Sequence, residues 1–333
     1  MIALFYNAFR NPNGTITITK HIETMFRAMG EEVRIYRMVT KPGKSKPLTT
    51  VGGPLAREVD VNAAIDIVNN YPSLMVHYMH DGSVNQEYAV RLVLETGLPF
   101  IIHDHRGLKP EMLDAARRSN ARIVFIRDTL RKRFNEESDI HYDTIFLKHP
   151  YIRHEDVDVK MKYNAVSLGR VAREKKIEMV CQANALLLDR KMPRIMISGA
   201  ETDRIYSHFT LDKFFPRWKD YRIKEPGTDQ YALCCSTRNA VDMSEFKGDG
   251  GGTQYTFLEA MDAGSQLILN SKWLYHRGAE MRAGYNCWSV GTPAELAEIV
   301  SREPRPLEGY DDTLYAHSFK SVGDGWLDVC YER

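Results

Sequence analysis

The most constraining feature of the sequence is a regular alternation between short apolar runs and longer segments with helical spacing. Ile2–Tyr6 is an apolar run of strand length, and Thr15–Met29 follows it with apolar residues such as Ile18 and Ile22 on one helical face. Strands that alternate with helices are typical of a parallel sheet, because each helix carries the chain back across the sheet. The sequence therefore predicts an α/β protein of the doubly wound kind.

The alternation is interrupted once, at Lys148–Asp156, where His149-Pro150 breaks the rhythm. A length of 333 residues suits two domains. We expect a Rossmann-like domain at 1–150, a second one at 151–310, and a tail at 311–333 that packs back on the first. Two such domains are expected to face each other across a cleft at the carboxyl ends of both sheets. The expected strands are Ile2–Tyr6, Val33–Met38, Leu74–Tyr78, Phe100–His103, Arg122–Ile126, Thr144–Leu147, Asn164–Leu168, Arg194–Ser198, Val241–Ser244, Gln266–Asn270 and Cys287–Val290.

Composition excludes several classes of protein. The 45 basic residues nearly balance the 44 acidic ones, so net charge gives no argument for a polyanionic partner. No segment approaches the roughly 20 apolar residues of a membrane helix. The apolar run at Met1–Tyr6 is too short for a signal peptide, so we expect none there. Five cysteines without CxxC spacing fit neither a disulfide framework nor a structural zinc site, so we expect reduced thiols in a cytoplasm.

The first motif that carries chemistry is the segment 167–176, in which an expected strand ends at Gly169 and a helix follows. Arg170 and Lys175 flank the start of this helix. A diphosphate requires fixed cations together with exposed helix amides, and Arg and Lys supply bidentate and point charges. The segment is therefore a candidate diphosphate site, and the alternative is a basic helix start that faces water.

The second motif is the segment 250–264, a glycine-rich turn before a helix. Gly252 would let the backbone approach a phosphate, and the amides of Tyr255 and Thr256 open the helix. Glu259 lies one turn further, where a carboxylate can accept hydrogen bonds from two ribose hydroxyls. A comparable polar loop ends at Gly14 before the first helix, and it is either a ligand site or an ordinary connection.

Together these two motifs resemble those of retaining GT-B glycosyltransferases of the glycogen-synthase-like group. Gly169-Arg170…Lys175 is similar to the first signature of that family, and Leu258-Glu259-Ala260-Met261…Gly264 is similar to the end of the second. The resemblance implies a nucleotide-sugar donor, most simply a UDP-sugar, bound without a metal ion. It also implies that Arg170 and Lys175 hold the diphosphate, that Glu259 holds the ribose, and that transfer retains configuration. The family's earlier glutamate falls on Gly251, so sugar recognition differs or Asp249 substitutes.

A further resemblance is to phage DNA α-glucosyltransferase-type enzymes. It rests on the runs 101–106 (Ile-Ile-His-Asp-His-Arg) and 255–259 (Tyr-Thr-Phe-Leu-Glu), and on the glycine-containing first loop. The resemblance implies that the acceptor is a hydroxymethylated base in duplex DNA, inside a host cytoplasm. The first domain would then be the acceptor side and the second the nucleotide-sugar domain.

His103 and Asp104 follow an expected strand and should lie at the carboxyl edge of the first sheet. Asp104 can take the proton of the acceptor hydroxyl or stabilise positive charge on the sugar carbon, and His103 can donate to the sugar. One alternative is a pair of satisfied histidines at a strand end. Another is a metal site that joins His103, Asp104 and His105 with His80 and Asp81, but adjacent strand residues point to opposite faces, so we expect no metal.

A DNA acceptor requires a basic surface on the first domain, and the target base would be flipped into the cleft. The alternative is that the basic run at 131–133 is a solvated helix face with its own countercharges at 136–139. Three functions remain open: a DNA base glycosyltransferase, a GT-B transferase acting on a polysaccharide, lipid or small molecule, and a catalytically silent sugar- or DNA-binding relative. The candidate DNA-binding residues are Arg106, Arg131, Lys132, Arg133 and Lys44.

Overall fold

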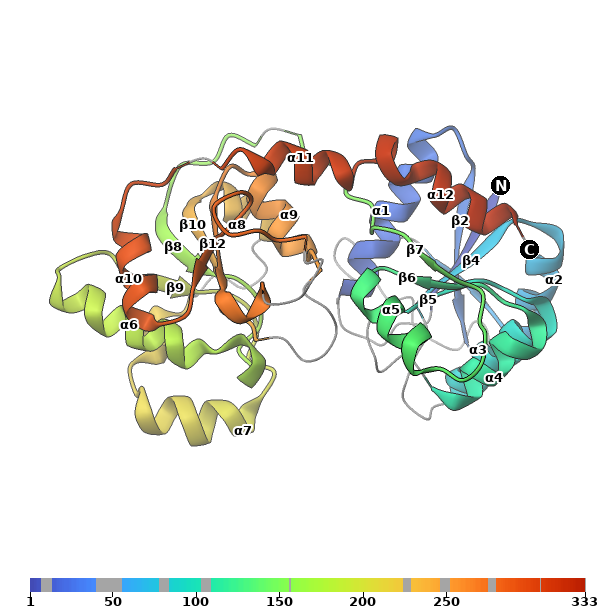
Figure 1. Ribbon diagram of the computed structural model, residues 1–333, viewed down its shortest axis with the longest axis horizontal. Coiled ribbons are helices and arrows are strands. Elements are labelled where there is room, and N and C mark those ends of the chain that lie inside the picture. Colours follow the sequence, from blue (N-terminus) through green and yellow to red (C-terminus); the bar gives the residue numbers. More distant parts are fainter. Residues whose placement is uncertain are drawn as a thin grey trace. The chain divides into compact units, whose positions relative to one another are not determined.

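The chain forms two compact units. One consists of Met1–Ile152 together with Tyr315–Arg333, and the other of Arg153–Leu314. Both are α/β units built on a parallel sheet, as the sequence predicts (Figure 1). The computed structural model describes residues 1–6, 14–39, 56–77, 84–102, 109–155, 157–223, 229–245, 252–274, 280–305 and 307–332.

The first unit contains a sheet with the strand order β3-β2-β1-β4-β5-β6-β7, in which every described pairing is parallel. The order reverses between β1 and β4, and such a switch point is where open α/β sheets bind ligands. The strands are β1 (Ile2–Tyr6), β2 (Val33–Met38), β3 (Arg57–Val59), β4 (Ser73–His77), β5 (Phe100–Ile102), β6 (Ile123–Phe125) and β7 (Thr144–Phe146).

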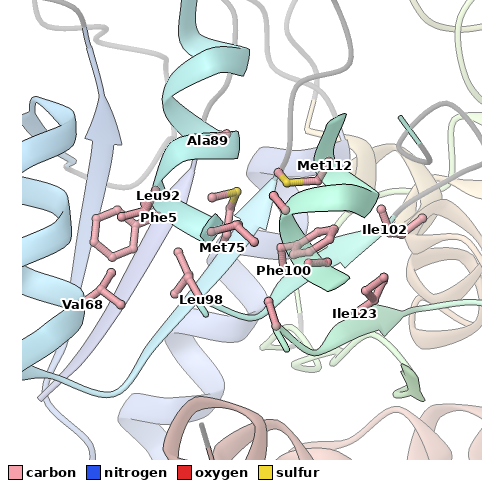
Figure 2. Close-up of a cluster of buried hydrophobic side chains, with 14 of the residues drawn as sticks. Phe5, Val68, Met75, Ala89, Leu92, Leu98, Phe100, Ile102, Met112 and Ile123 are labelled. Atoms are coloured by element: carbon pink, nitrogen blue, oxygen red, sulfur yellow. The ribbon is translucent and has the colours of Figure 1, made fainter. Parts of the chain in front are cut away.

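Helices cover both faces of this sheet. Alternate strand residues point to opposite faces, so Phe5, Met75 and Phe100 contribute to one core, where α2 to α4 supply residues such as Val68 and Met112 (Figure 2). Helices α1 and α12 contact each other, and both contact β4. The helices are α1 (Gly14–Ala28), α2 (Val61–Asn70), α3 (Val84–Thr96), α4 (Pro110–Ser119), α5 (Asp128–Glu137) and α12 (Phe319–Tyr331).

The C-terminal helix α12 is fixed to the first unit by specific contacts. The indole of Trp326, which is fully buried, donates to the carbonyl of Lys148 at 2.9 Å. A Cβ on Gly323 would lie 2.6 Å from the sulfur of Met29, so the absence of a side chain lets α12 approach the end of α1 closely. These contacts explain why the last residues of the chain belong with the first unit rather than with the segment that precedes them.

The second unit contains a sheet with the order β12-β11-β10-β8-β9, again parallel throughout the described pairings. Its switch point lies between β8 and β10. Helices α6 and α10 contact each other over one core, whereas α8 and α9 contact each other beside β10 and β11. The strands are β8 (Tyr163–Ser167), β9 (Ile195–Ile197), β10 (Thr237–Asp242), β11 (Gln266–Asn270) and β12 (Trp288–Val290), and the longer helices are α6 (Ile177–Asp189), α8 (Gln230–Cys235), α9 (Tyr255–Asp262), α10 (Pro293–Ser301) and α11 (Gly309–Ala316).

The expected strand at Val241–Ser244 is misplaced, because β10 spans Thr237–Asp242. The first residues of β10 are polar, so the start of this strand does not form an apolar run. Asn239 is fully buried; its amide donates to the carbonyl of Asn164 at 2.8 Å and accepts from the amide of Gln266 at 2.8 Å. Both contacts satisfy a buried polar side chain on a central strand.

A helical segment after β9 was not predicted at all. It comprises α7 (Arg204–Tyr206) and a π-helix (Ser207–Asp212), followed by a short turn of helix at Trp218–Tyr221. Tyr206 and Leu211 are buried, while Ile205, Phe209 and Phe214 are exposed. The buried residues are five positions apart and the exposed ones four and five, which is the spacing that the wider turn of a π-helix produces. Among the described helices, none is long and apolar enough to cross a membrane.

Candidate functional site

The connection between β8 and α6 is held against the loop that follows β9. Gly169 and Gly199 both have positive φ, at 93° and 83°. A Cβ on Gly199 would lie 2.2 Å from the carbonyl oxygen of Gly169, so the two backbones touch. The amide of Val171 donates to the carbonyl of Ala200 at 2.8 Å, which fixes the loop further. The first candidate motif is therefore a rigid turn at the carboxyl end of β8.

Arg170 lies at the surface of this turn. Its guanidinium donates to Oε1 of Glu174 from Nε at 3.2 Å and from Nη2 at 2.7 Å. The side chain of Arg170 is 55% exposed and that of Glu174 is 18% exposed. Arg170 is thus available to solvent, but its charge already has a carboxylate partner.

Lys175 is enclosed instead. Its side chain passes over Gly169, where an added Cβ would lie 3.3 Å from Cε of Lys175. The ammonium lies 2.9 Å from Oδ2 of Asp242, and the two side chains are 14% and 1% exposed. The other oxygen of Asp242 accepts from the amide of Ser244 at 2.8 Å and from the Ser244 hydroxyl. This buried pair joins the β8–α6 connection to the end of β10.

A second tie runs between the same two segments. The amide of Glu245 donates to the carbonyl of Glu174 at 2.9 Å. The Glu245 carboxylate lies 3.0 Å from the ammonium of Lys176 and 2.6 Å from that of Lys272. Burial opposes ionisation of Glu245, but the hydrogen bonds from Lys272 and Lys176 outweigh it and lower its pKa. The result is a charged edge at the carboxyl ends of β8 and β10.

Helix α9 begins at Tyr255, and its N-cap, Gln254, makes no side-chain capping bond. The carbonyl of Gln254 accepts from the amides of Phe257 and Leu258. The amides of Tyr255 and Thr256 precede the first intrahelical bond of α9. Gly252 is not one of the glycines with a positive φ. Thr253, the next residue, donates from its hydroxyl to Glu280 at 2.5 Å.

Glu259 lies inside α9 and is 9% exposed. Its carboxyl group makes no hydrogen bond or ion pair with the residues that the structure describes. Burial, followed by the nearby charges of Asp229 and Asp262, raises the pKa of Glu259 from 4.5 to about 8. A buried carboxyl without a cation is expensive, and strongly shifted groups of this kind gather at functional sites.

In the first unit, Gly14 is the first residue of α1. Strand β5 ends at Ile102, at the carboxyl edge of its sheet. The sequence-predicted residues His103, Asp104, Arg106 and Lys44 lie outside the described residues.

The basic run on α5 carries its own countercharges. Arg131 and Lys132 contact Asp128 at 2.8 and 2.7 Å, and Arg133 contacts Glu137 at 2.8 Å. Arg127 occupies the N-cap of α5, and Asp128 is its first helical residue. Burial opposes ionisation of Asp128, but its bonds to Lys132 and Arg131 prevail and lower its pKa. The countercharges are thus Asp128 and Glu137, and of these two only Glu137 lies in the expected segment 136–139.

No group of three or more histidine, cysteine, aspartate or glutamate side chains suited to a metal ion occurs in the described part of the chain. The alternative metal site that the sequence suggested involves His80, Asp81 and residues 103–105. All of these lie outside the described ranges.

Comparison with known proteins gives a fold but no sequence match. No family model matches the chain, and no curated protein matches it in sequence. Among solved structures, an alpha-glucosyltransferase bound to UDP and a 13-mer DNA containing an HMU base has a TM-score of 0.72 at 13% identity, with 99% of each chain covered. The pneumococcal O-GlcNAc transferase GtfA, bound to UDP and GlcNAc, has a TM-score of 0.70 at 8% identity, also with 99% of each chain covered.

The chain has the GT-B fold. A third structure of this group, Anabaena HepE with UDP and glucose, has a TM-score of 0.58 at 14% identity and covers 98% of this chain and 95% of its own. All three neighbours are complexes with UDP, and two of them also contain a sugar. The TM-scores establish the GT-B architecture. Because the sequence identities are so low, the activity has to be argued from the residues.

Sequence reasoning missed the carboxylates around the candidate site. Glu174 and Asp242 are the partners of the two predicted cations, and Asp229 and Asp262 surround Glu259. A signal for Asp242 was present, since a polar residue at the end of a buried parallel strand points to the ligand edge of the sheet. The expected strand continued to Ser244, so Asp242 was not recognised as the residue at the end of β10.

Proposed function

We propose that the chain is a glycosyltransferase that moves a sugar from a UDP-sugar to a hydroxymethylated base in DNA, with retention. The nucleotide-sugar donor is proposed to bind at the carboxyl edge of the sheet in the second unit, and one observation supports this. The turn of Arg170 and Lys175 is tied there to the end of β10, and the same β10 leads to α9, which holds Glu259. In this proposal the second unit is the nucleotide-sugar domain and the first is the acceptor-side domain.

The donor would bind through charge and hydrogen bonds. Arg170 and Lys175 would hold the diphosphate, together with the amides of Tyr255 and Thr256 at the start of α9. Glu259 would accept from the ribose hydroxyls, which gives its otherwise costly buried carboxyl a partner. Gly14 and Gly252 would let the backbone approach the donor. This arrangement supplies cations from the protein itself, so no metal ion is required at the diphosphate.

The reaction breaks the bond between the sugar carbon and the diphosphate oxygen. It forms a bond from that carbon to the hydroxymethyl oxygen, whose proton passes to Asp104 or to the departing diphosphate. The cations neutralise the charge that develops on the leaving diphosphate. His103 and Asp104, which follow β5, are proposed as the donor to the sugar and as the carboxylate that assists the acceptor or stabilises the sugar carbon.

The DNA acceptor is supported by the resemblance of the runs at 101–106 and 255–259 to phage DNA α-glucosyltransferase-type enzymes. The neighbour with a bound HMU-containing DNA is a second support. Arg106, Arg131, Lys132, Arg133 and Lys44 are the proposed phosphate contacts. A host cytoplasm follows if the enzyme modifies phage DNA. The competing acceptors are a polysaccharide, a lipid, a protein or a small molecule. They stay open because the GT-B fold alone does not fix the acceptor, and one neighbour is an O-GlcNAc transferase.

A transfer assay with mass detection tests the proposal. UDP-sugars are incubated with the chain and with plain DNA, hydroxymethylcytosine DNA, hydroxymethyluracil DNA or oligosaccharides. The proposal predicts a sugar-sized gain in mass on the hydroxymethylated DNA alone. Transfer only to saccharides would keep the donor site and remove the DNA acceptor. Donor binding without hydrolysis or transfer, in the native chain as in Asp104→Asn, would identify a catalytically silent relative.

A further inference from the structure

The two cations of the proposed donor site have counter-ions of very different kinds. The geometry points to a division of labour in which Glu174 is an exchangeable counter-ion that the donor diphosphate displaces from Arg170, and Asp242 is a positioning residue that permanently holds Lys175. This inference rests on the proposed function, because it assigns the diphosphate of that function as the displacing ligand.

The Arg170–Glu174 pair can be exchanged. Both residues lie on one short turn, and the Arg170 side chain is 55% exposed. Water reaches Arg170, so a second anion can approach its guanidinium, although the Glu174 side chain is only 18% exposed. A diphosphate presents several anionic oxygens to the same guanidinium and can make bidentate bonds to it. Glu174 would therefore compete with the diphosphate for the guanidinium of Arg170.

The Lys175–Asp242 pair cannot be exchanged in this way. Asp242 is 1% exposed, and both of its oxygens are engaged, one with Lys175 and the other with Ser244. Displacing this carboxylate would leave a buried charge without a partner. Asp242 instead fixes the ammonium over Gly169, at the turn where the diphosphate is proposed to bind.

The two carboxylates should consequently respond to neutralisation in opposite directions. Glu174→Gln removes a competitor and should tighten UDP binding by about two- to fivefold, the range of a surface ion pair. Asp242→Asn leaves the ammonium without its countercharge and free to leave the turn, so UDP binding should weaken by about tenfold or more. A merely structural role for Glu174 cannot produce a gain in affinity.

The experiment is a calorimetric titration with UDP of the native chain, Glu174→Gln and Asp242→Asn, in low and high salt. Glu298→Gln is the matched control, since Glu298 forms an i,i+4 pair with Arg302 on α10 and the variant has the same change in net charge. Glu174→Gln is also measured in an Arg170→Ala background. The gain in affinity should be absent there and absent in Glu298→Gln.

Equal affinity of Glu174→Gln and the native chain would overturn the exchange, as would the same gain without Arg170. Native or higher affinity in Asp242→Asn, with folding checked by circular dichroism, would overturn the positioning role. The proposed function itself fails by a different result: no UDP binding by the native chain, or no loss on Arg170→Ala.

Discussion

Gly199 lies so close to Gly169 that a Cβ on Gly199 would stand 2.2 Å from the carbonyl oxygen of Gly169. The contact is between backbones, so no side-chain rotation can relieve it. It places the loop after β9 against the turn that presents Arg170, and it makes the shape of that turn depend on a residue 30 positions away.

The first prediction concerns this contact. Gly199→Ala should destabilise the chain by about 3 kcal/mol or more, because overlap with a backbone atom adds to the strain of a positive φ. Gly264→Ala is the control, since Gly264 has a φ of 72° but open space around a Cβ, and should cost only about 1 kcal/mol. Urea unfolding measures both values. Equal costs would show that the two loops do not touch.

The second prediction concerns the pH dependence of stability. Burial raises the pKa of Glu259 to about 8, so the folded chain keeps a proton that the unfolded chain loses near pH 4.5. The stabilisation is fully present below pH 4.5 and is lost as the pH rises to about 8, amounting to a few kcal/mol. Glu259→Gln cannot titrate. The free energy of unfolding of the native chain, relative to this variant, should fall between pH 5 and 8, and a constant difference would contradict the burial.

The third prediction links the same carboxyl to the nucleotide. If ribose hydroxyls donate to an ionised Glu259, UDP binding near pH 7 must release the proton that the carboxyl of Glu259 holds without nucleotide. Calorimetry in buffers of different ionisation enthalpy measures this release. Glu259→Gln should bind UDP more weakly and release less. Proton release that is identical in the variant would remove Glu259 from the nucleotide site.

The fourth prediction concerns the helix α5 and DNA. Replacing Arg131, Lys132 and Arg133 with alanine should reduce the slope of log affinity against log salt by about one for each DNA phosphate that these side chains neutralise. Asp128→Asn should have the opposite effect and tighten DNA binding, because it removes the carboxylate that pairs with Arg131 and Lys132. If neither variant changes the slope, α5 is a solvated face and not a DNA contact.

Much of this architecture is predictable from the sequence because the strands are buried on both faces. The apolar runs Ile2–Tyr6, Val33–Met38 and Gln266–Asn270 have the predicted bounds. The start of β10 was not predictable from apolar runs, since its buried Asn239 is satisfied only by neighbouring strands. The helix containing Phe209 was missed because its winding departs from the α-helical period.

The sequence singles out two candidate cations but not the carboxylates that pair with them. Arg170 and Lys175 stand out because a glycine and a helix start flank them in sequence. Asp242 is 67 residues from Lys175, and their contact exists only because β8 and β10 are neighbours in the sheet. The shifted pKa of Glu259 likewise depends on burial and on Asp229 and Asp262, which no local pattern reveals.

The central claim is that the turn after β8 binds the diphosphate of a nucleotide sugar. A calorimetric titration of the native chain and of Arg170→Ala with UDP tests it most directly, with Arg302→Ala as a control for the removal of a surface cation. The account predicts saturable binding by the native chain and the control, and about tenfold or greater weakening in Arg170→Ala, as expected when a charge-assisted hydrogen bond is removed. Equal affinity in all three proteins, or no binding by the native chain, would contradict it.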